Sequence, residues 1–205
     1  MGMIRKLILE ARDRLDRKEE RNNLIFRRFF NVLPKETERV FIFVGTGSEA
    51  STLPIIEKLL DMGISVFCPK VIGRDIEFFE IKALSDLAPG RYNIPEPDVE
   101  EPGRLIEEIV EEKAAYPDDS ISCLMVMPGV VFDETGGRMG YGAGMYDRYL
   151  ENRPCFKIAL AYEVQVREKP LVLMPTDVKI DALITERCLR RFSGDKGEKQ
   201  PGGDA

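Results

Sequence analysis

The chain has 205 residues, a formal net charge of −6 and no histidine. This length suits one domain with a single buried core. An acidic chain without a basic block argues against nucleic acid as the main partner. The lack of histidine excludes Ser-His-Asp triads, histidine zinc ligands and histidine general bases.

The sequence carries no pattern typical of a membrane or secreted protein. No apolar run approaches the roughly 20 residues that a membrane-spanning helix needs. The first six residues lack the apolar segment and the cleavage site of a signal peptide. The four cysteines have no metal-binding or redox spacing: Cys68, Cys123, Cys155 and Cys188. We therefore expect a cytoplasmic protein without a membrane partner.

Helical periodicity predicts two helices at the start of the chain. The first places apolar residues on one face, namely Ile4, Leu7, Ile8, Ala11 and Leu15. The second, which ends before Pro34, buries Leu24, Ile25, Phe29 and Leu33. Most of the basic residues of the first helix are expected on a solvated face: Arg5, Lys6, Arg12 and Arg14.

Apolar runs then alternate with helical segments along the chain. Strands are expected near 40–44, 64–68, 76–81, 122–127, 156–162 and 182–185, and one helix begins at Pro102. This alternation predicts an α/β fold, with one layered domain and a mostly parallel sheet over residues 1–192. A Gly-, Lys- and Asp-rich tail, 193–205, is expected to be disordered.

Ligands of such a sheet bind beyond the carboxyl ends of its strands. The loops at 45–52, 128–147 and 163–165 all follow strand ends, so we expect them to line one cleft. The first of these loops has the glycine pattern of dinucleotide-binding proteins, Gly45-x-Gly47-x-x-Ala50. That fingerprint also needs an acidic residue at the end of the next strand, which here ends in Pro69-Lys70. A dinucleotide site at this loop, which would retain NAD, stays open as an alternative.

The most informative stretch runs from Pro128 to Leu150 and reads PGVVFDETGGRMGYGAGMYDRYL. Glycines occupy every second position from Gly140 to Gly144, which lets the backbone amides approach a ligand closely. Such a loop, entering a short helix near Tyr146, can present N–H donors to phosphate oxygens. Arg138 adds a cation, and Asp147 adds an oxygen ligand of the kind that Mg²⁺ prefers. The plain alternative is a surface loop that joins a strand to a helix.

This string resembles the signature of the 5-formyltetrahydrofolate cyclo-ligase (5,10-methenyltetrahydrofolate synthetase) family, P-G-x-x-F-D-x-x-G-x-R-L-G-x-G-x-G-Y-Y-D. The chain differs from that pattern by Met139 in place of leucine and by Met145 in place of the first tyrosine of the pair. The resemblance covers roughly residues 3–190. It implies the fold of ribose-5-phosphate isomerase, glucosamine-6-phosphate deaminase and the CoA transferases. It also implies ATP- and Mg²⁺-dependent closure of 5-formyltetrahydrofolate to 5,10-methenyltetrahydrofolate, with release of ADP and phosphate.

The resemblance further implies roles for individual residues. Arg138 and Tyr146 would be catalytic. ATP would contact Arg5, Arg138, Met139, Gly140, Tyr141, Gly142, Ala143, Gly144, Met145 and Tyr146. 5-Formyltetrahydrofolate would contact Thr46, Glu49, Tyr92, Tyr141 and Met145. Magnesium would be held by Asp147 and Asp177.

Several of these roles have alternatives. Tyr92, in a proline-stiffened loop at 91–97, could stack on a pterin ring or simply pack within its loop. Asp177 could be a turn or cap residue. Ser51 stands where the family usually has a second acid, and Thr176 where it often has histidine.

Other functions also stay open. A sugar-phosphate isomerase or a CoA transferase on the same fold would not need ATP. The sequence does not indicate the oligomeric state or a site for a polyglutamate tail.

Overall fold

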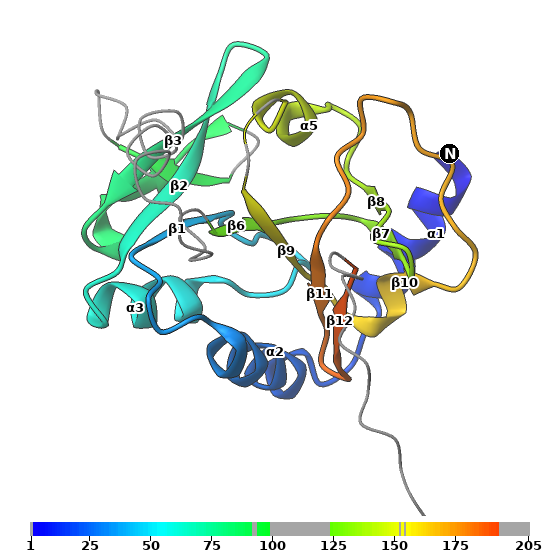
Figure 1. Cartoon of the computed structure of the whole chain (residues 1–205), viewed down its shortest axis with the longest axis horizontal. Coiled ribbons are helices and arrows are strands. Elements are labelled where there is room, and N and C mark those ends of the chain that lie inside the picture. Colours follow the sequence, from blue (N-terminus) through cyan, green and yellow to red (C-terminus); the bar gives the residue numbers. More distant parts are fainter. Residues whose placement is uncertain (1, 92–93, 99–123, 152, 154, 193–205) are drawn as a thin grey trace, which may run out of the picture.

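The computed structural model describes residues 2–91, 94–98, 124–151, 153 and 155–192 (Figure 1). Tyr92, the helix expected from Pro102 and the tail 193–205 lie outside these residues. In the part of the chain that is described, no helix is both long and apolar enough to cross a membrane.

A seven-stranded sheet lies at the centre, in the order β12-β11-β9-β6-β1-β2-β3. The five inner strands are parallel: β11 (Ala182–Ile184), β9 (Phe156–Leu160), β6 (Leu124–Met127), β1 (Arg39–Ile42) and β2 (Ser65–Ile72). The edge strands β3 (Asp75–Ile81) and β12 (Leu189–Arg191) are antiparallel. The expected α/β fold with a mostly parallel sheet is confirmed, but strand β12 was not expected.

Both faces of the sheet are covered, as the apolar strand runs require. Val40 and Ile42 of β1 point to the face packed by α2 (Lys18–Val32) and α3 (Leu53–Asp61). Phe41 points to the opposite face, which α5 (Met145–Tyr149) covers in part. Figure 1 shows α2 and α3 together on one side of the sheet and α5 on the other.

Helix α1 (Gly2–Asp13) lies beside a second, three-stranded sheet. That sheet consists of β10 (Val166–Arg167), β7 (Val131–Asp133) and β8 (Arg138–Met139). Ile4 and Ile8 of α1 pack on Val130, Val131 and Met139, which form a small apolar cluster.

The buried face of α1 differs from the predicted one. Leu7 is 58% exposed, whereas Arg12 is only 4% exposed. Residues four apart lie on one face of a helix, so Ile4, Ile8 and Arg12 form the inward stripe and Leu7 lies outside it. In α2, Leu24 is likewise exposed where burial was expected.

The stretch 128–147 is a hairpin followed by a short loop, not one long loop. Strands β7 and β8 pair antiparallel. The buried Asp133 carboxylate holds the turn between them by accepting hydrogen bonds from the amides of Thr135 and Gly137, both at 2.8 Å. It also accepts a hydrogen bond from the Leu171 amide at 2.6 Å. Only residues 140–144 then remain as an irregular loop before α5.

The remaining elements are short. Strands β4 (Leu87–Pro89) and β5 (Pro95–Pro97) pair where only a stiffened loop was expected. The 3-10 helices η1 (Leu84–Asp86) and η3 (Glu163–Gln165) follow β3 and β9.

Candidate functional site

The loops that follow β1, β6 and β9 lie together, because these three strands are neighbours in the parallel sheet. Gln165, after β9, donates a hydrogen bond from Nε2 to the Gly129 carbonyl at 2.9 Å. The Tyr162 hydroxyl, also after β9, donates to Asn22 Oδ1 of α2 at 2.7 Å and lies 3.4 Å from the Glu49 carbonyl. The edge expected to carry the site is therefore a connected assembly of loops.

The loop from Gly140 to Gly144 leaves its amides open. Gly142 has a φ of +108°, a conformation that side chains other than glycine rarely adopt. Among the residues that the structure describes, the amides of residues 141–144 have no acceptor. The guanidinium of Arg5 lies alongside, 3.3 Å from the point where a Cβ on Gly142 would stand. Open amides thus lie next to a cation.

Arg138 forms a second cationic wall of the loop. Its side chain is 4% exposed and donates from Nη2 to Asp147 Oδ1 at 2.7 Å. The guanidinium carbon lies 5.9 Å from the centre of the Tyr146 ring, which is within cation–π range. In the described part of the chain, Nε of Arg138 and Nε of Arg5 are buried without a hydrogen-bond partner. Both guanidiniums therefore keep unused donor capacity beside the loop.

Asp147 and Asp177 lie near each other, because the Val178 amide donates to Asp147 Oδ1 at 3.0 Å. Asp177 Oδ2 caps its own turn by accepting from the Met174 amide at 2.7 Å. Within the described residues, Oδ2 of Asp147 and Oδ1 of Asp177 have no partner. Asp181, by contrast, forms an ion pair with Lys157 at 2.8 Å.

This donor set suits a cation that also binds phosphate. No group of three or more acidic, cysteine or histidine side chains that could hold a metal is present in the described residues. Mg²⁺ beside a nucleotide commonly takes only one or two carboxylates, with phosphate oxygens and water completing its shell. The two free carboxylate oxygens fit that pattern.

Glu49 connects the loop after β1 to the Gly140–Gly144 loop. Its Oε1 accepts a hydrogen bond from the Tyr141 hydroxyl at 2.7 Å, and its Oε2 accepts one from the Thr46 amide at 3.0 Å. Burial, and then the charge of Glu49, raises the pKa of Tyr141 to about 12 and also raises the pKa of Tyr146. Both phenols therefore stay protonated near neutral pH and can donate hydrogen bonds.

Several amides of the loop at Gly45 are already bound to groups of the protein. The Gly45 amide donates to Thr52 Oγ1 at 2.8 Å, and the Ser51 amide donates to Asn22 Oδ1 at 3.1 Å. The Thr46 amide is taken by Glu49. Strand β2 contains no acidic residue, so the acid that a dinucleotide site needs at the end of this strand is also missing. This geometry offers little to a pyrophosphate.

The structure gives less support to ligand contacts by the other predicted site residues. The side chain of Met139 is buried against α1, so only its backbone could reach a ligand. Met145 is partly buried under the sheet. The Ala143 carbonyl is held by the Arg148 guanidinium at 2.8 Å.

Two polar residues at the site were not among the predicted site residues, although the loop 163–165, which contains Gln165, was expected to line the cleft. Gln165 is buried and anchors the start of the 128–150 stretch. Arg12 is buried and donates to the Tyr141 hydroxyl at 2.8 Å. The spacing of Arg12 from Ile4 and Ile8 is the feature of the sequence that could have revealed it.

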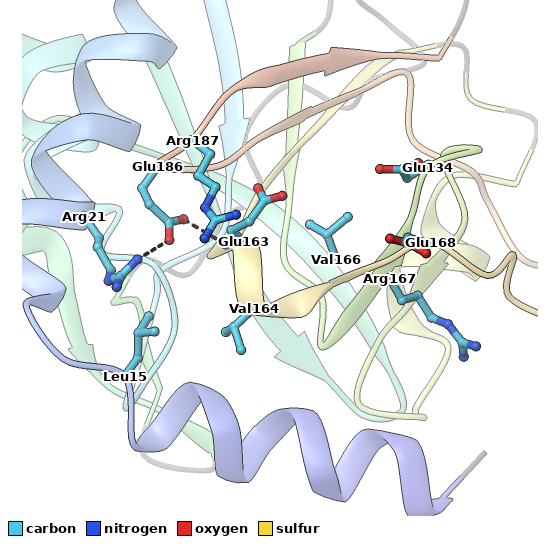
Figure 2. A pocket seen from close by; sticks show the side chains of 10 residues that line it. All are labelled: Leu15, Arg21, Glu134, Glu163, Val164, Val166, Arg167, Glu168, Glu186 and Arg187. Atoms are coloured by element: carbon cyan, nitrogen blue, oxygen red, sulfur yellow. Dashed lines mark hydrogen bonds and ion pairs between the residues drawn. The ribbon is translucent and has the colours of Figure 1, made fainter.

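A hollow of about 400 Å³ lies at the ends of β9 and β11, and Figure 2 shows the side chains that line it. Part of its charged lining is already paired. Arg21 forms an ion pair with Glu186, and Glu163 forms one with Arg190 at 2.6 Å. None of the predicted site residues that the structure describes lines the hollow. We therefore place the candidate site at the Gly140–Gly144 loop.

Comparison with known proteins identifies the family of the chain. The model of the 5-formyltetrahydrofolate cyclo-ligase family matches residues 2–186. A probable 5-formyltetrahydrofolate cyclo-ligase of Schizosaccharomyces pombe is 30% identical over 160 residues, which cover 70% of this chain and 72% of that protein. The 5-formyltetrahydrofolate cyclo-ligase of Escherichia coli K12 is 29% identical over 152 residues, covering 71% and 76%.

A solved structure gives the same result for the fold. The NMR structure of Aquifex aeolicus 5,10-methenyltetrahydrofolate synthetase superimposes with a TM-score of 0.77 at 26% identity. The superposition covers 97% of this chain and 96% of that one. The resemblance, the fold class and the enzyme class expected from the sequence are thus confirmed: the chain belongs to the 5-formyltetrahydrofolate cyclo-ligase family.

Proposed function

We propose that this chain closes 5-formyltetrahydrofolate to 5,10-methenyltetrahydrofolate at the expense of ATP, releasing ADP and phosphate. One observation carries the proposal beyond family membership. The Gly140–Gly144 loop presents open amides between two guanidiniums that have donors to spare, those of Arg5 and Arg138. Open amides and fixed cations in one place are what a triphosphate needs.

The nucleotide would lie along this loop. Amides of residues 141–144 would donate to phosphate oxygens, and Arg5 and Arg138 would offset phosphate charge. Tyr146, which is packed beside Arg138, would keep that guanidinium in place. Asp147 restrains the same guanidinium from the other side through its Oδ1.

Asp147 and Asp177 would hold Mg²⁺ through the oxygens that have no protein partner. When bound, the ion supplies positive charge that neutralises phosphate oxygens during transfer. Asp147 would then serve two functions, because one oxygen orients Arg138 and the other faces the ion.

The folate would lie toward the loop after β1. Glu49, Thr46 and Tyr141 form its polar wall, and Met145 and Tyr92 are proposed to contact the substrate as well. Because Tyr141 bonds to Glu49, the two substrate regions adjoin.

The chemistry is consistent with a chain that has no histidine. The formyl oxygen attacks the γ-phosphorus, a new P–O bond forms, and the bond to the β-phosphate oxygen breaks to release ADP. N10 of the folate then attacks the activated formyl carbon. The C–O bond breaks, phosphate leaves, and the N10 proton passes to phosphate or water. The nucleophiles are atoms of the substrate, so the protein's task is to align two substrates and offset charge.

The proposal extends to the organisation of the chain. Residues 1–192 form the catalytic domain, and the protein acts in the cytoplasm. A sugar-phosphate isomerase or CoA transferase on this fold is disfavoured, since neither reaction uses a triphosphate loop.

The direct test is incubation of the purified chain with ATP, Mg²⁺ and 5-formyltetrahydrofolate while the absorbance of the methenyl product is followed. We expect product only when all three are present, with one ADP released per closure. Closure that proceeds equally well without ATP would contradict the proposal. Turnover of a sugar phosphate or an acyl-CoA in place of the folate would do the same, and so would NAD retained through purification.

A further inference from the structure

Arg12 is a buried cation whose guanidinium donates hydrogen bonds to two hydroxyl groups. It lies on the inward stripe of α1 and is 4% exposed. Its Nε donates to Ser48 Oγ at 3.0 Å and its Nη2 donates to the Tyr141 hydroxyl at 2.8 Å. Its guanidinium carbon also lies 5.8 Å from the centre of the Tyr141 ring. A buried guanidinium is costly unless its donors are matched, so this placement indicates a specific role.

The contacts of Arg12 continue across the site as a chain of hydrogen bonds. Arginine can only donate, so the Tyr141 oxygen accepts from Arg12 and its single proton goes to Glu49, 2.7 Å away. Glu49 in turn accepts from the Thr46 amide at 3.0 Å. The chain therefore has a fixed direction, from α1 through the Gly140–Gly144 loop to the loop after β1.

We propose that Arg12 is a positioning residue that acts through Tyr141 to couple the binding of ATP to the binding of 5-formyltetrahydrofolate. This inference rests on the proposed function. Tyr141 belongs to the loop proposed for the nucleotide, whereas Glu49 belongs to the wall proposed for the folate. A ligand that orders either loop also restricts the position of Tyr141. Because Arg12 holds the Tyr141 hydroxyl against Glu49, this restriction also orders the other loop. Such coupling is reciprocal by thermodynamic necessity.

Arginine suits this role better than lysine. Its planar fork donates to Ser48 and Tyr141 in two fixed directions while its central carbon lies 5.8 Å from the centre of the tyrosine ring. A lysine ammonium is a point charge on a flexible stem, and it would satisfy one hydroxyl without fixing the other. Arg12→Lys therefore keeps the charge and removes the geometry.

The test is a binding cycle by titration calorimetry. The dissociation constant of a non-hydrolysable ATP analogue is measured with Mg²⁺, with and without saturating 5-formyltetrahydrofolate. We compare the unaltered protein with Arg12→Lys, Tyr141→Phe and the double variant. Arg14→Ala is the control, because Arg14 is an exposed residue of the same chain segment.

In the unaltered protein we expect the folate to tighten the analogue about fivefold or more, the usual range of such coupling. We expect Arg12→Lys and Tyr141→Phe each to abolish most of this factor, the double variant to lose no more than either single one, and Arg14→Ala to keep it. Melting temperatures should change little in Tyr141→Phe, which keeps the ring and leaves no cavity.

Two results would overturn the inference. One is an unaltered protein that closes the folate but shows no coupling between its ligands. The other is full coupling in Arg12→Lys or Tyr141→Phe. Failure of the proposed function has a different appearance, because the unaltered protein would then form no methenyl product with ATP.

Discussion

Two loops in this molecule follow a buried strand and carry alternating glycines, yet in the described part of the chain only the second has four consecutive open amides beside a cation. In the loop after β1, the amides of Gly45, Thr46 and Ser51 donate to Thr52, Glu49 and Asn22. In the loop after β8, the amides of residues 141–144 have no acceptor within the described part of the chain. A glycine pattern therefore does not identify a phosphate site; the partners of its amides do.

The glycines of the two loops also serve different purposes. A Cβ on Gly45 would stand 2.4 Å from the Ala50 carbonyl oxygen, so glycine is needed there for packing. Gly142 has a φ of +108° and lies beside the Arg5 guanidinium, so glycine is needed there for conformation and access. The nearest charge is also opposite in sign, because Glu49 closes the first loop and Arg5 flanks the second.

The largest expected effect concerns the carboxylates beyond the second loop. If Asp177 helps to hold Mg²⁺, Asp177→Asn keeps the size of the side chain but removes the charge that a hard cation needs. Loss of one such electrostatic interaction typically costs about 2.7–4 kcal/mol at the transition state, or roughly a hundred- to thousandfold in rate. Because weakened binding responds to mass action, raising Mg²⁺ should restore part of the rate. Steady-state rates measured across a magnesium titration test this prediction.

Asp181 provides the matched control for that measurement. It lies four residues further on and forms an ion pair with Lys157 instead of facing Asp147. Asp181→Asn should therefore show no magnesium-dependent loss. A normal rate for Asp177→Asn at limiting Mg²⁺, or a magnesium-sensitive loss in Asp181→Asn, would refute the assignment.

The second prediction compares affinity with stability at Gly142. In Gly142→Val, the loop conformation seen here would require a branched side chain at a positive φ beside Arg5, which costs about 1–3 kcal/mol. The exposed loop therefore relaxes to another conformation in the free protein, and the cost falls on ATP binding. Each 1.4 kcal/mol is tenfold in affinity, so the Kd for ATP should rise about tenfold or more. The melting temperature should change little, since this loop faces solvent. Equal losses of affinity and stability would instead favour a loop that only links strand to helix.

Gly45→Ala should have the opposite effect, a loss of stability without a loss of ATP affinity. Its new Cβ meets a backbone oxygen that cannot move aside without shifting the loop, and overpacking of this kind costs about 1–3 kcal/mol of stability. ATP affinity should stay the same because the Gly45 and Thr46 amides are already bound within the loop and Glu49 gives the loop a negative charge. Gly47→Ala is the control for conformational strain without overpacking. Its φ is +58°, but its new Cβ would have no atom within 4 Å. A loss of ATP affinity in Gly45→Ala that exceeds its loss of stability would mean that the loop does bind phosphate.

The structure of the second loop could be predicted from the sequence better than that of the first, for a physical reason. Apolar runs determine strands locally, so the five parallel strands were predictable. The open conformation of the Gly140–Gly144 loop was predictable because it depends on the loop's own glycines. The closure of the first loop depends on Asn22 and Thr52, and the burial of Arg12 depends on Tyr141, so these features arise only when distant segments meet. The hairpin ahead of Gly140 was missed because Asp133 bonds to Leu171, 38 residues away.

The smallest expected effect is a difference in pH dependence between the side chains that hold the two loops in place. Thr52, whose hydroxyl does not titrate near neutral pH, holds the loop after β1, whereas the Asp133 carboxylate holds the hairpin before Gly140. Burial alone would raise the pKa of Asp133, but hydrogen bonds from Leu171, Thr135 and Gly137 outweigh it, so its pKa in the folded protein lies below the ordinary value. A carboxyl whose pKa is lowered by folding stabilises the protein above its unfolded pKa, about 3.9, and loses that contribution as the pH falls through the folded pKa. The second loop should therefore lose support in acid, and the first should not.

Melting curves of the unaltered protein, Asp133→Asn and Thr52→Val from pH 7 to pH 3 test this difference. At pH 7 Asp133→Asn should melt several degrees lower, because its amide cannot accept every hydrogen bond of the carboxylate, and 1 kcal/mol corresponds to roughly 2–4 °C in a chain of this size. The difference in melting temperature should narrow below about pH 4. Protonation of Asp133 then removes the stabilisation by the charged carboxylate from the unaltered protein, which the variant already lacks. Thr52→Val should also melt lower, but by an amount that does not depend on pH, since no proton is exchanged at that position. A gap for Asp133→Asn that stays constant down to pH 3 would show that the charge of Asp133 contributes nothing to holding the hairpin, and that its packing alone does so.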